Sequence, residues 1–64
     1  MNNRLPQLRQ QHQLSQAALA ELAGVSRQTI ISIEKGRFDP SLPLAFRLAA
    51  IFGCTIEDIF DPES

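Results

Sequence analysis

The feature that most constrains the fold is the three-residue turn at 24–26, Gly-Val-Ser, which separates two segments with the pattern of short helices. Before the turn, Ser15 is a favourable N-cap, and residues 16–23 carry leucines and alanines on one apolar face. After it, Ser26 can cap a helix over residues 27–35. Because a short turn with glycine sets two helices at a steep angle, we expect the second helix to project from the body of the domain.

Turn signals divide the rest of the chain into three further short helices. Asn3, Ser41 and Thr55 are the expected N-caps, and Thr55 with Asp58 resembles a capping box. No segment alternates apolar and polar residues with period 2 over a useful length. An all-α bundle with short connections is therefore the economical architecture. The expected helices cover residues 4–12, 16–23, 27–35, 42–52 and 56–60.

The chain has 64 residues, which is enough for one domain of marginal stability. It has one cysteine, Cys54, and one histidine, His12, so it can form neither an internal disulfide nor a Cys/His zinc site. We expect Cys54 to be a buried, inert thiol because it lies in an apolar context. His12 is expected at the surface, at the end of a helix. No metal or cofactor is expected.

Large apolar side chains exceed what a core of this size readily hides, so some are expected to contact a second subunit. A twofold homodimer is the commonest arrangement, and it would present two copies of the projecting helix. The alternative is that these side chains complete the core of a monomer. The residues concerned are Phe38, Phe46, Phe52, Ile59 and Phe60.

Charge is distributed unevenly along the chain. Residues 1–37 have five basic and two acidic side chains, for a net charge of +3, whereas residues 38–64 have one basic and five acidic side chains, for −4. The first part could therefore face phosphates while the acidic tail faces away from them. The alternative is that such a split arises by chance in a short chain.

The exposed face of segment 27–35 carries side chains suited to reading a nucleic acid. An arginine can bond the edge of guanine bidentately, and a glutamine can do the same with adenine. The alternative is an ordinary solvated helix face. The side chains expected to point outward near the start of this helix are Arg27, Gln28, Ile31 and Ser32.

Residues 15–36 read SQAALAELAGVSRQTIISIEKG. This segment resembles the Cro/repressor-type (Xre-type) helix-turn-helix family, which has the pattern Ser-Gln-x-x-Leu-Ala-x-x-Ala-Gly-Val-Ser-x-x-x-Ile-x-x-Ile-Glu-x-Gly. The likeness extends through 40–41, 48–49, 52–53 and 59–60, and so covers nearly the whole chain. It implies a compact five-helix bundle of the lambda-repressor-like DNA-binding type. Residues 1–64 would form a single helix-turn-helix DNA-binding domain, with the motif made by the second and third helices.

The resemblance also implies roles for particular residues. Gln16 would contact a DNA phosphate and brace the recognition helix. Arg9 and Glu34 match a structural pair that links the first helix to the end of the third. Gln13 stands where the family usually has glycine, which puts the local turn geometry in question. The residues implied at the DNA are Gln16 and Ser26 at helix starts that favour phosphate, Arg27, Gln28 and Ser32 near base edges, Thr29 at backbone or base, and Lys35 and Arg37 near flanking phosphates.

The sequence therefore predicts a transcription regulator, most simply a repressor that occludes a promoter, which binds double-stranded DNA as a homodimer in the cytoplasm. No nucleophile–base or metal set is present, so no enzymatic activity and no small-molecule substrate are expected. No apolar run approaches the length of a membrane span. A protein-interaction module on the same fold is the alternative, which the net charge of −1 keeps open.

Overall fold

Four of the five helices begin at the hydroxyl side chain that the sequence indicates. In the computed structural model, which describes residues 1–62, the side chains of Ser15, Ser26, Ser41 and Thr55 each accept a hydrogen bond from a backbone N–H of the first turn. The helices are α1 (Leu5–Gln11), α2 (Gln16–Ala23), α3 (Arg27–Glu34), α4 (Leu42–Phe52) and α5 (Ile56–Ile59).

The predicted capping box at the start of α5 is confirmed. The Thr55 hydroxyl accepts a hydrogen bond from the Asp58 N–H, and the Thr55 N–H donates to the Asp58 carboxylate at 3.0 Å. The backbone hydrogen bond from Thr55 is the main reason why the pKa of Asp58 lies below its ordinary value. This carboxylate therefore stays charged at the helix start, where the dipole favours an anion.

The first helix begins differently from the prediction. Arg4, not Asn3, is the N-cap residue and makes no side-chain capping bond, while Asn3 Oδ1 accepts a hydrogen bond from the Leu5 N–H at 3.1 Å. Asn3 belongs to strand β1 (Asn2–Asn3), which pairs antiparallel with β2 (Phe60–Asp61). The purely helical expectation missed this pair because two residues are too short to show an alternating pattern.

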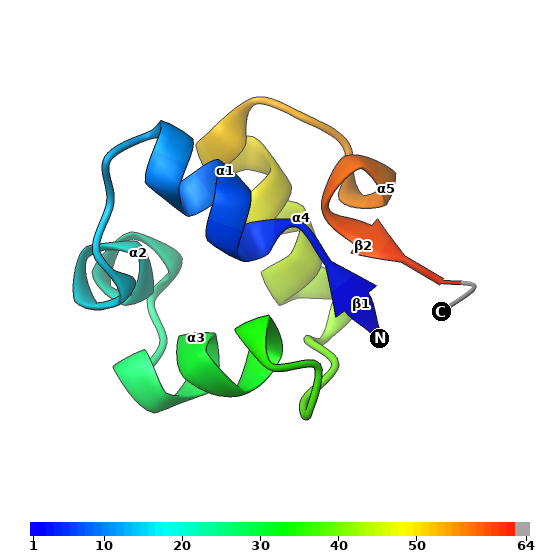
Figure 1. Cartoon of the computed structure of the whole chain (residues 1–64), viewed down its shortest axis with the longest axis horizontal. Coiled ribbons are helices and arrows are strands. Elements are labelled where there is room, and N and C mark those ends of the chain that lie inside the picture. Colours follow the sequence, from blue (N-terminus) through cyan, green and yellow to red (C-terminus); the bar gives the residue numbers. More distant parts are fainter. Residues whose placement is uncertain (63–64) are drawn as a thin grey trace.

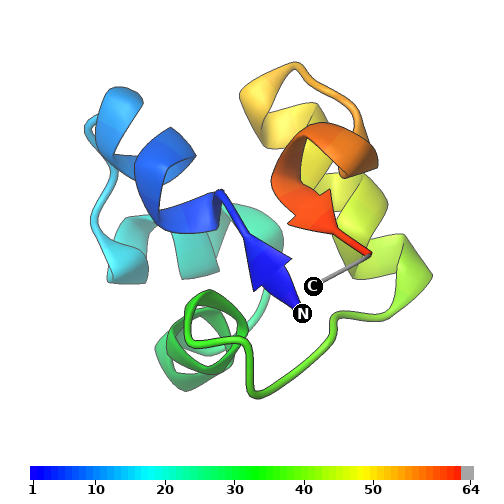
Figure 2. The ribbon, with the colours of Figure 1, turned by 45° about the vertical axis from the view of Figure 1, so that its right-hand side comes forward.

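All five helices contribute to one core. In Figure 2, α1 and α2 lie on one side and α4 and α5 on the other, with α3 below them; in Figure 1, α4 is seen between α1 and α3. Small side chains at Ala20 and Ala23 are buried on α2 and let α3 pack closely against it. The largest fully buried side chains are Leu5, Leu19, Ile30, Ile33, Leu48 and Ile59.

The turn between α2 and α3 has the predicted left-handed glycine. Gly24 has φ of +72°, and the next residue, Val25, packs half-buried against the core. Arg47 of α4 donates a hydrogen bond from Nη1 to the carbonyl oxygen of Ala23 at 2.7 Å. This bond satisfies an end carbonyl of α2 and fixes the corner from which α3 departs.

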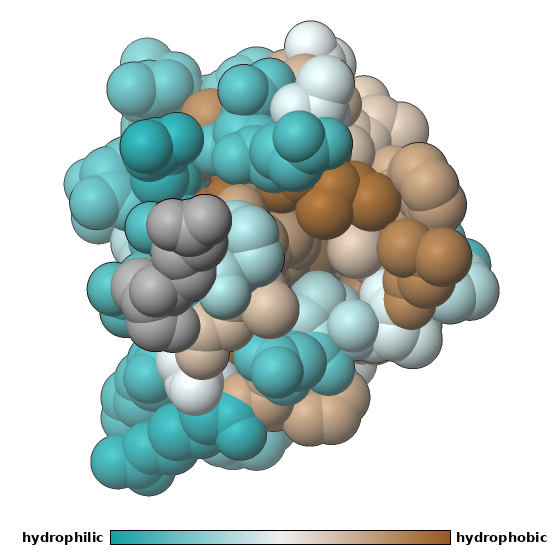
Figure 3. All heavy atoms as spheres, turned by 90° about the vertical axis from the view of Figure 1, so that its right-hand side faces the viewer, coloured by the Kyte–Doolittle hydropathy of each residue, from teal (hydrophilic) through white to brown (hydrophobic). Residues whose placement is uncertain are grey.

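The five large apolar residues considered for a subunit contact divide into two groups. Phe52, Ile59 and Phe60 are buried, whereas Phe38 and Phe46 are 47% and 60% exposed. Figure 3 shows apolar side chains gathered on one side of a face that is hydrophilic on the other. Phe52, Ile59 and Phe60 therefore complete the core, whereas the contact of Phe38 and Phe46 with a second subunit stays a prediction.

Cys54 departs from its predicted environment, whereas His12 agrees with it. Cys54 is half-buried rather than buried, because it sits just beyond the end of α4 and only packs against the edge of the core. Desolvation, together with the nearby Asp58 charge, raises its thiol pKa, so the thiol stays protonated and unreactive. His12 is exposed at the end of α1, as predicted, with its ring against the edge of Phe52.

Among residues 1–62, Gln13 is the only non-glycine residue with a left-handed backbone, and its φ is +57°. We expect Gln13→Gly to raise the free energy of unfolding by up to about 1 kcal/mol, because a left-handed residue with a Cβ costs about 1–2 kcal/mol and the flexibility of unfolded glycine offsets part of the gain. Urea titration followed by circular dichroism measures this change.

The matched control is Gln10→Gly, at an exposed helical position of α1. It should lower stability by about 1 kcal/mol, because glycine is unfavourable within a helix. A loss at position 13 as large as the loss at position 10 would show that the φ of Gln13 is not a source of strain.

Candidate nucleic-acid interface

The third helix has one buried face and one open face. Ile30 and Ile33 are fully covered, while Arg27 and Gln28 at the first turn are exposed. In Figures 1 and 2, α3 runs along the edge of the molecule, with the other helices on one side of it only. The start of α3 is thus free to enter a groove, as a recognition helix requires.

A shallow hollow of about 310 Å³ lies against this open face. It brings together residues from the start and middle of α3 and from the loop after it. The Ser26 and Thr29 hydroxyls lie 2.9 Å apart, and Gln28 Nε2 is 3.5 Å from the Ser32 hydroxyl. These short polar groups can donate and accept toward a ligand in the hollow. Its lining residues are Ser26, Gln28, Thr29, Ser32, Arg37 and Phe38.

Phe38 is the residue of this surface that sequence reasoning assigned elsewhere. The sequence makes it a candidate for a subunit contact. In the structure its half-exposed ring lies in the wall of the hollow with Gln28 and Ser32. Its place in the sequence could have indicated this position, because Phe38 follows Arg37, which comes directly after the glycine that ends α3. Such an aromatic ring could contact a sugar or a thymine methyl group.

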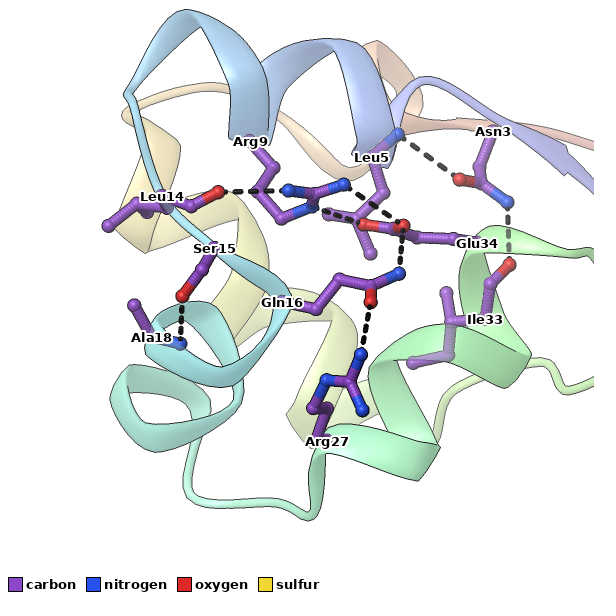
Figure 4. A network of polar contacts seen from close by, with 10 residues as sticks. All are labelled: Asn3, Leu5, Arg9, Leu14, Ser15, Gln16, Ala18, Arg27, Ile33 and Glu34. Atoms are coloured by element: carbon purple, nitrogen blue, oxygen red, sulfur yellow. Dashed lines mark hydrogen bonds and ion pairs between the residues drawn. The ribbon is translucent and has the colours of Figure 1, made fainter.

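A chain of polar contacts joins the interior to the start of α3 (Figure 4). Arg9 Nε lies 2.7 Å from Glu34 Oε2, and Gln16 Nε2 donates to Glu34 Oε1 at 3.1 Å. On its other side, Gln16 Oε1 accepts a hydrogen bond from Arg27 Nη2 at 3.3 Å. The predicted bracing of the recognition helix by Gln16 is therefore present as a direct contact with Arg27.

The pairing of Arg9 with Glu34, which the resemblance implied, is confirmed. Only 15% of the Arg9 side chain and 8% of the Glu34 side chain are exposed. Arg9 Nη1 also donates to the carbonyl oxygen of Leu14 at 2.9 Å, in the turn before α2. The ion pair therefore ties α1, this turn and the end of α3 together.

The remaining predicted residues lie apart from the hollow and from this chain of contacts. Ile31, expected to point outward, is half-buried. Lys35 is exposed at the end of α3, where a cation suits the helix dipole. Its contact with a flanking phosphate stays a prediction, as do the base and phosphate contacts of the other residues.

Three of the five acidic residues of segment 38–64 lie away from the open face of α3. Glu57, Asp58 and Asp61 belong to α5 and β2, which lie across the molecule from the start of α3 in Figures 1 and 2. Asp39, in the loop after α3, has its carboxylate 3.8 Å from the N-terminal ammonium group, and Glu63 lies outside the described residues. This arrangement keeps most of the negative charge away from the surface that would meet phosphates.

Residues 1–62 contain neither a cluster of metal ligands nor a membrane-spanning helix. No group of three or more His, Cys, Asp or Glu residues in that range could hold a metal ion. None of the described helices has both the length and the apolar character that crossing a bilayer requires.

Comparisons with known proteins agree with this geometry. A family model described as helix-turn-helix matches residues 7–59. An uncharacterized HTH-type transcriptional regulator of Methanocaldococcus jannaschii is 60% identical over 60 residues, which cover 94% of this chain and 91% of that one. Among solved structures, the restriction-modification controller protein C.AhdI of Aeromonas hydrophila superposes with a TM-score of 0.80 and 33% identity, over 89% of this chain and 86% of that chain.

One similar structure is an enzyme. Hydroxypropylphosphonic acid epoxidase from S. wedmorenis superposes with a TM-score of 0.81 and 30% identity, over 94% of this chain but only 32% of the epoxidase. The likeness is therefore confined to about one third of that protein.

Proposed function

The chain belongs to the helix-turn-helix family, and from that premise we propose that it regulates transcription by inserting the start of α3 into the major groove of DNA. The observation that carries this proposal is the open face of α3, where Arg27 and Gln28 are exposed and Gln28 lines a hollow together with the side chains of Ser32 and Phe38. Occlusion of a promoter by the bound protein is the simplest mode of action, so we propose a repressor.

The contacts divide into those that read bases and those that hold phosphates. We propose that Arg27 and Gln28 bond base edges, together with Ser32, whose hydroxyl lies 3.5 Å from Gln28 Nε2. Ser26, Thr29 and Gln16 lie at helix starts, where N–H groups attract phosphate. Lys35 and Arg37 add positive charge at the other end of α3. A regulator with these contacts works where chromosomal DNA is found, which in a bacterial or archaeal cell is the cytoplasm.

The first test is binding to DNA fragments at several salt concentrations. We expect tight binding to a subset of fragments, with an affinity that falls linearly with salt on a logarithmic scale. Lys35→Ala should weaken binding to all sequences alike and reduce the slope by about 1, because one phosphate contact is lost. Fluorescence anisotropy measures both quantities.

Arg4→Ala is the matched control, since Arg4 is an exposed cation whose Nη1 contacts the Asp58 carbonyl oxygen on the α5 side. It should leave the salt slope unchanged. If the wild-type chain binds no DNA fragment and instead captures a protein, the protein-interaction alternative replaces this proposal.

We also propose that the regulator acts as a homodimer, through a surface on α4. Leu42 and Phe46 are 63% and 60% exposed, and they lie one turn apart on the same side of the helix. A mainly apolar hollow of about 260 Å³ is lined in part by Leu42. A ring from one copy could fill the hollow of the other, as a twofold contact requires. The hollow is lined by Met1, Asp39, Pro40, Leu42, Ala45, Ile56 and Phe60.

Phe46→Glu tests the dimer directly. We expect it to weaken self-association by at least tenfold, because a charge would have to be buried in an apolar contact. Sedimentation equilibrium measures the dissociation constant. Leu22→Glu is the control, because Leu22 is 57% exposed on α2 and away from this surface. Equal effects of the two substitutions would argue against the α4 surface.

A further inference from the structure

We propose that Glu34 is a positioning residue for DNA recognition, because it orients the Gln16 amide and thereby fixes the direction of the Arg27 guanidinium. Glu34 itself is nearly covered and lies at the far end of α3 from Arg27. The inference rests on the proposed function, since it assigns a role within the recognition surface described above.

The two ends of the Gln16 amide group differ in their hydrogen bonding. The oxygen of a glutamine side chain only accepts hydrogen bonds, and its NH₂ group only donates. The ionised carboxylate of Glu34 only accepts, so the NH₂ group of Gln16 must face it, as it does at 3.1 Å. A reversed amide would bring two acceptor oxygens together at Glu34 and two donors together at Arg27. Glu34 therefore selects one of the two orientations of the Gln16 amide.

The selected orientation presents the Gln16 oxygen to Arg27. Arg27 Nη2 donates to Gln16 Oε1 at 3.3 Å, and Arg27 is otherwise exposed to solvent. An exposed arginine has many rotamers and loses this freedom when it binds. A contact that already holds the guanidinium reduces that loss and favours one direction of approach to the bases.

Glu34 can impose this order because it is itself held firmly. Its two carboxylate oxygens face Arg9 at 2.7 Å and 3.4 Å, and Arg9 is fixed in turn by the carbonyl oxygen of Leu14. Figure 4 shows the side chains in sequence, from the covered Arg9–Glu34 pair through half-buried Gln16 to Arg27 at the surface. The covered ion pair thus limits the orientations of Arg27, the residue that would read the DNA.

The decisive test separates positioning from stability. The double variant Arg9→Met/Glu34→Leu removes both charges and the acceptor for Gln16 while filling the same space with apolar side chains, which usually preserves the stability of a fold. In the wild-type chain we expect Arg27→Ala to reduce base discrimination at one position of the DNA site by about 5- to 150-fold. In the background of the double variant the same substitution should have an effect at least threefold smaller, because Arg27 no longer starts from a fixed direction.

A second measurement needs no DNA. Side-chain ¹⁵N relaxation should show the Arg27 Nε more mobile in the double variant than in the wild-type chain. Gln16→Met, which keeps the Arg9–Glu34 pair and breaks the chain of contacts at its middle link, should have the same effect. This single substitution also keeps the test available if the double variant does not fold.

Two results would overturn the inference: an effect of Arg27→Ala that is equal in both backgrounds, or unchanged Arg27 mobility in both variants. Failure of the proposed function is recognised separately. In that case the wild-type chain itself shows no sequence-dependent binding, while the relaxation measurement still decides whether Glu34 orders Arg27.

Discussion

Arg9→Ala is expected to lower the free energy of unfolding by about 3–5 kcal/mol, because it leaves the Glu34 carboxylate covered without its counter-charge. Glu34 would keep only the hydrogen bond from Gln16. The Leu14 carbonyl oxygen would also lose the donor that fixes the turn before α2. In a domain of this size the thermal midpoint should fall by at least about 12 °C, since 1 kcal/mol corresponds to about 4–8 °C.

Urea and thermal unfolding followed by circular dichroism measure the loss. Arg4→Ala removes an exposed arginine at the start of the same helix, α1, and should change stability by less than about 0.5 kcal/mol. Arg9→Met/Glu34→Leu should restore stability to within about 1 kcal/mol of the wild-type value or above it, because no charge is then left unpaired. A small effect of Arg9→Ala together with a large loss in the double variant would mean that the ion pair is not what joins α1 to α3.

In a chain carrying Arg27→Ala and Gln28→Ala, we expect the preference for the cognate DNA site over unrelated DNA to fall by about 2–6 kcal/mol, since each side chain is proposed to make a bidentate base contact, and such a contact is worth about 1–3 kcal/mol of discrimination. Binding to unrelated DNA should weaken far less, because Lys35, Arg37 and the helix starts still face the phosphates. The stability of the fold should hardly change, since both residues are exposed.

Competition binding with the selected site and a scrambled site of equal length measures this preference at fixed salt. Lys35→Ala is the matched comparison, because it should weaken both complexes equally and leave their ratio unchanged. If the double substitution lowers both affinities in parallel, then Arg27 and Gln28 contact only the backbone, and Ser32 with Phe38 becomes the candidate reader of the bases.

The helices could be predicted from the sequence because their ends are set locally. The hydroxyl caps at Ser15, Ser26 and Ser41, and the glycines after α2 and α4, act within a few residues of themselves. The bounds of α2 and α4 match the prediction, and the corner at Gly24 has the expected left-handed backbone. The predicted family resemblance likewise located the Arg9–Glu34 pair.

Other features could not be predicted because they depend on contacts between distant residues. The β1–β2 pair joins the two ends of the described chain, and neither strand is long enough to show a pattern of its own. The position of Phe38 depends on how the loop after α3 folds back beside Ser32. The orientation of the Gln16 amide follows from the carboxylate that lies against it, which no local rule identifies.

The short pairing of β1 with β2 also affects how the molecule moves. Chain ends in small domains usually fray independently of one another. Here the Arg4 N–H donates to the Ile59 carbonyl oxygen at 2.7 Å, and the Asn3 amide donates to the last turn of α3 at the Ile33 carbonyl oxygen. Opening of either strand therefore releases the other and loosens the end of the recognition helix, so that these segments should exchange their amide protons with water as one cooperative unit.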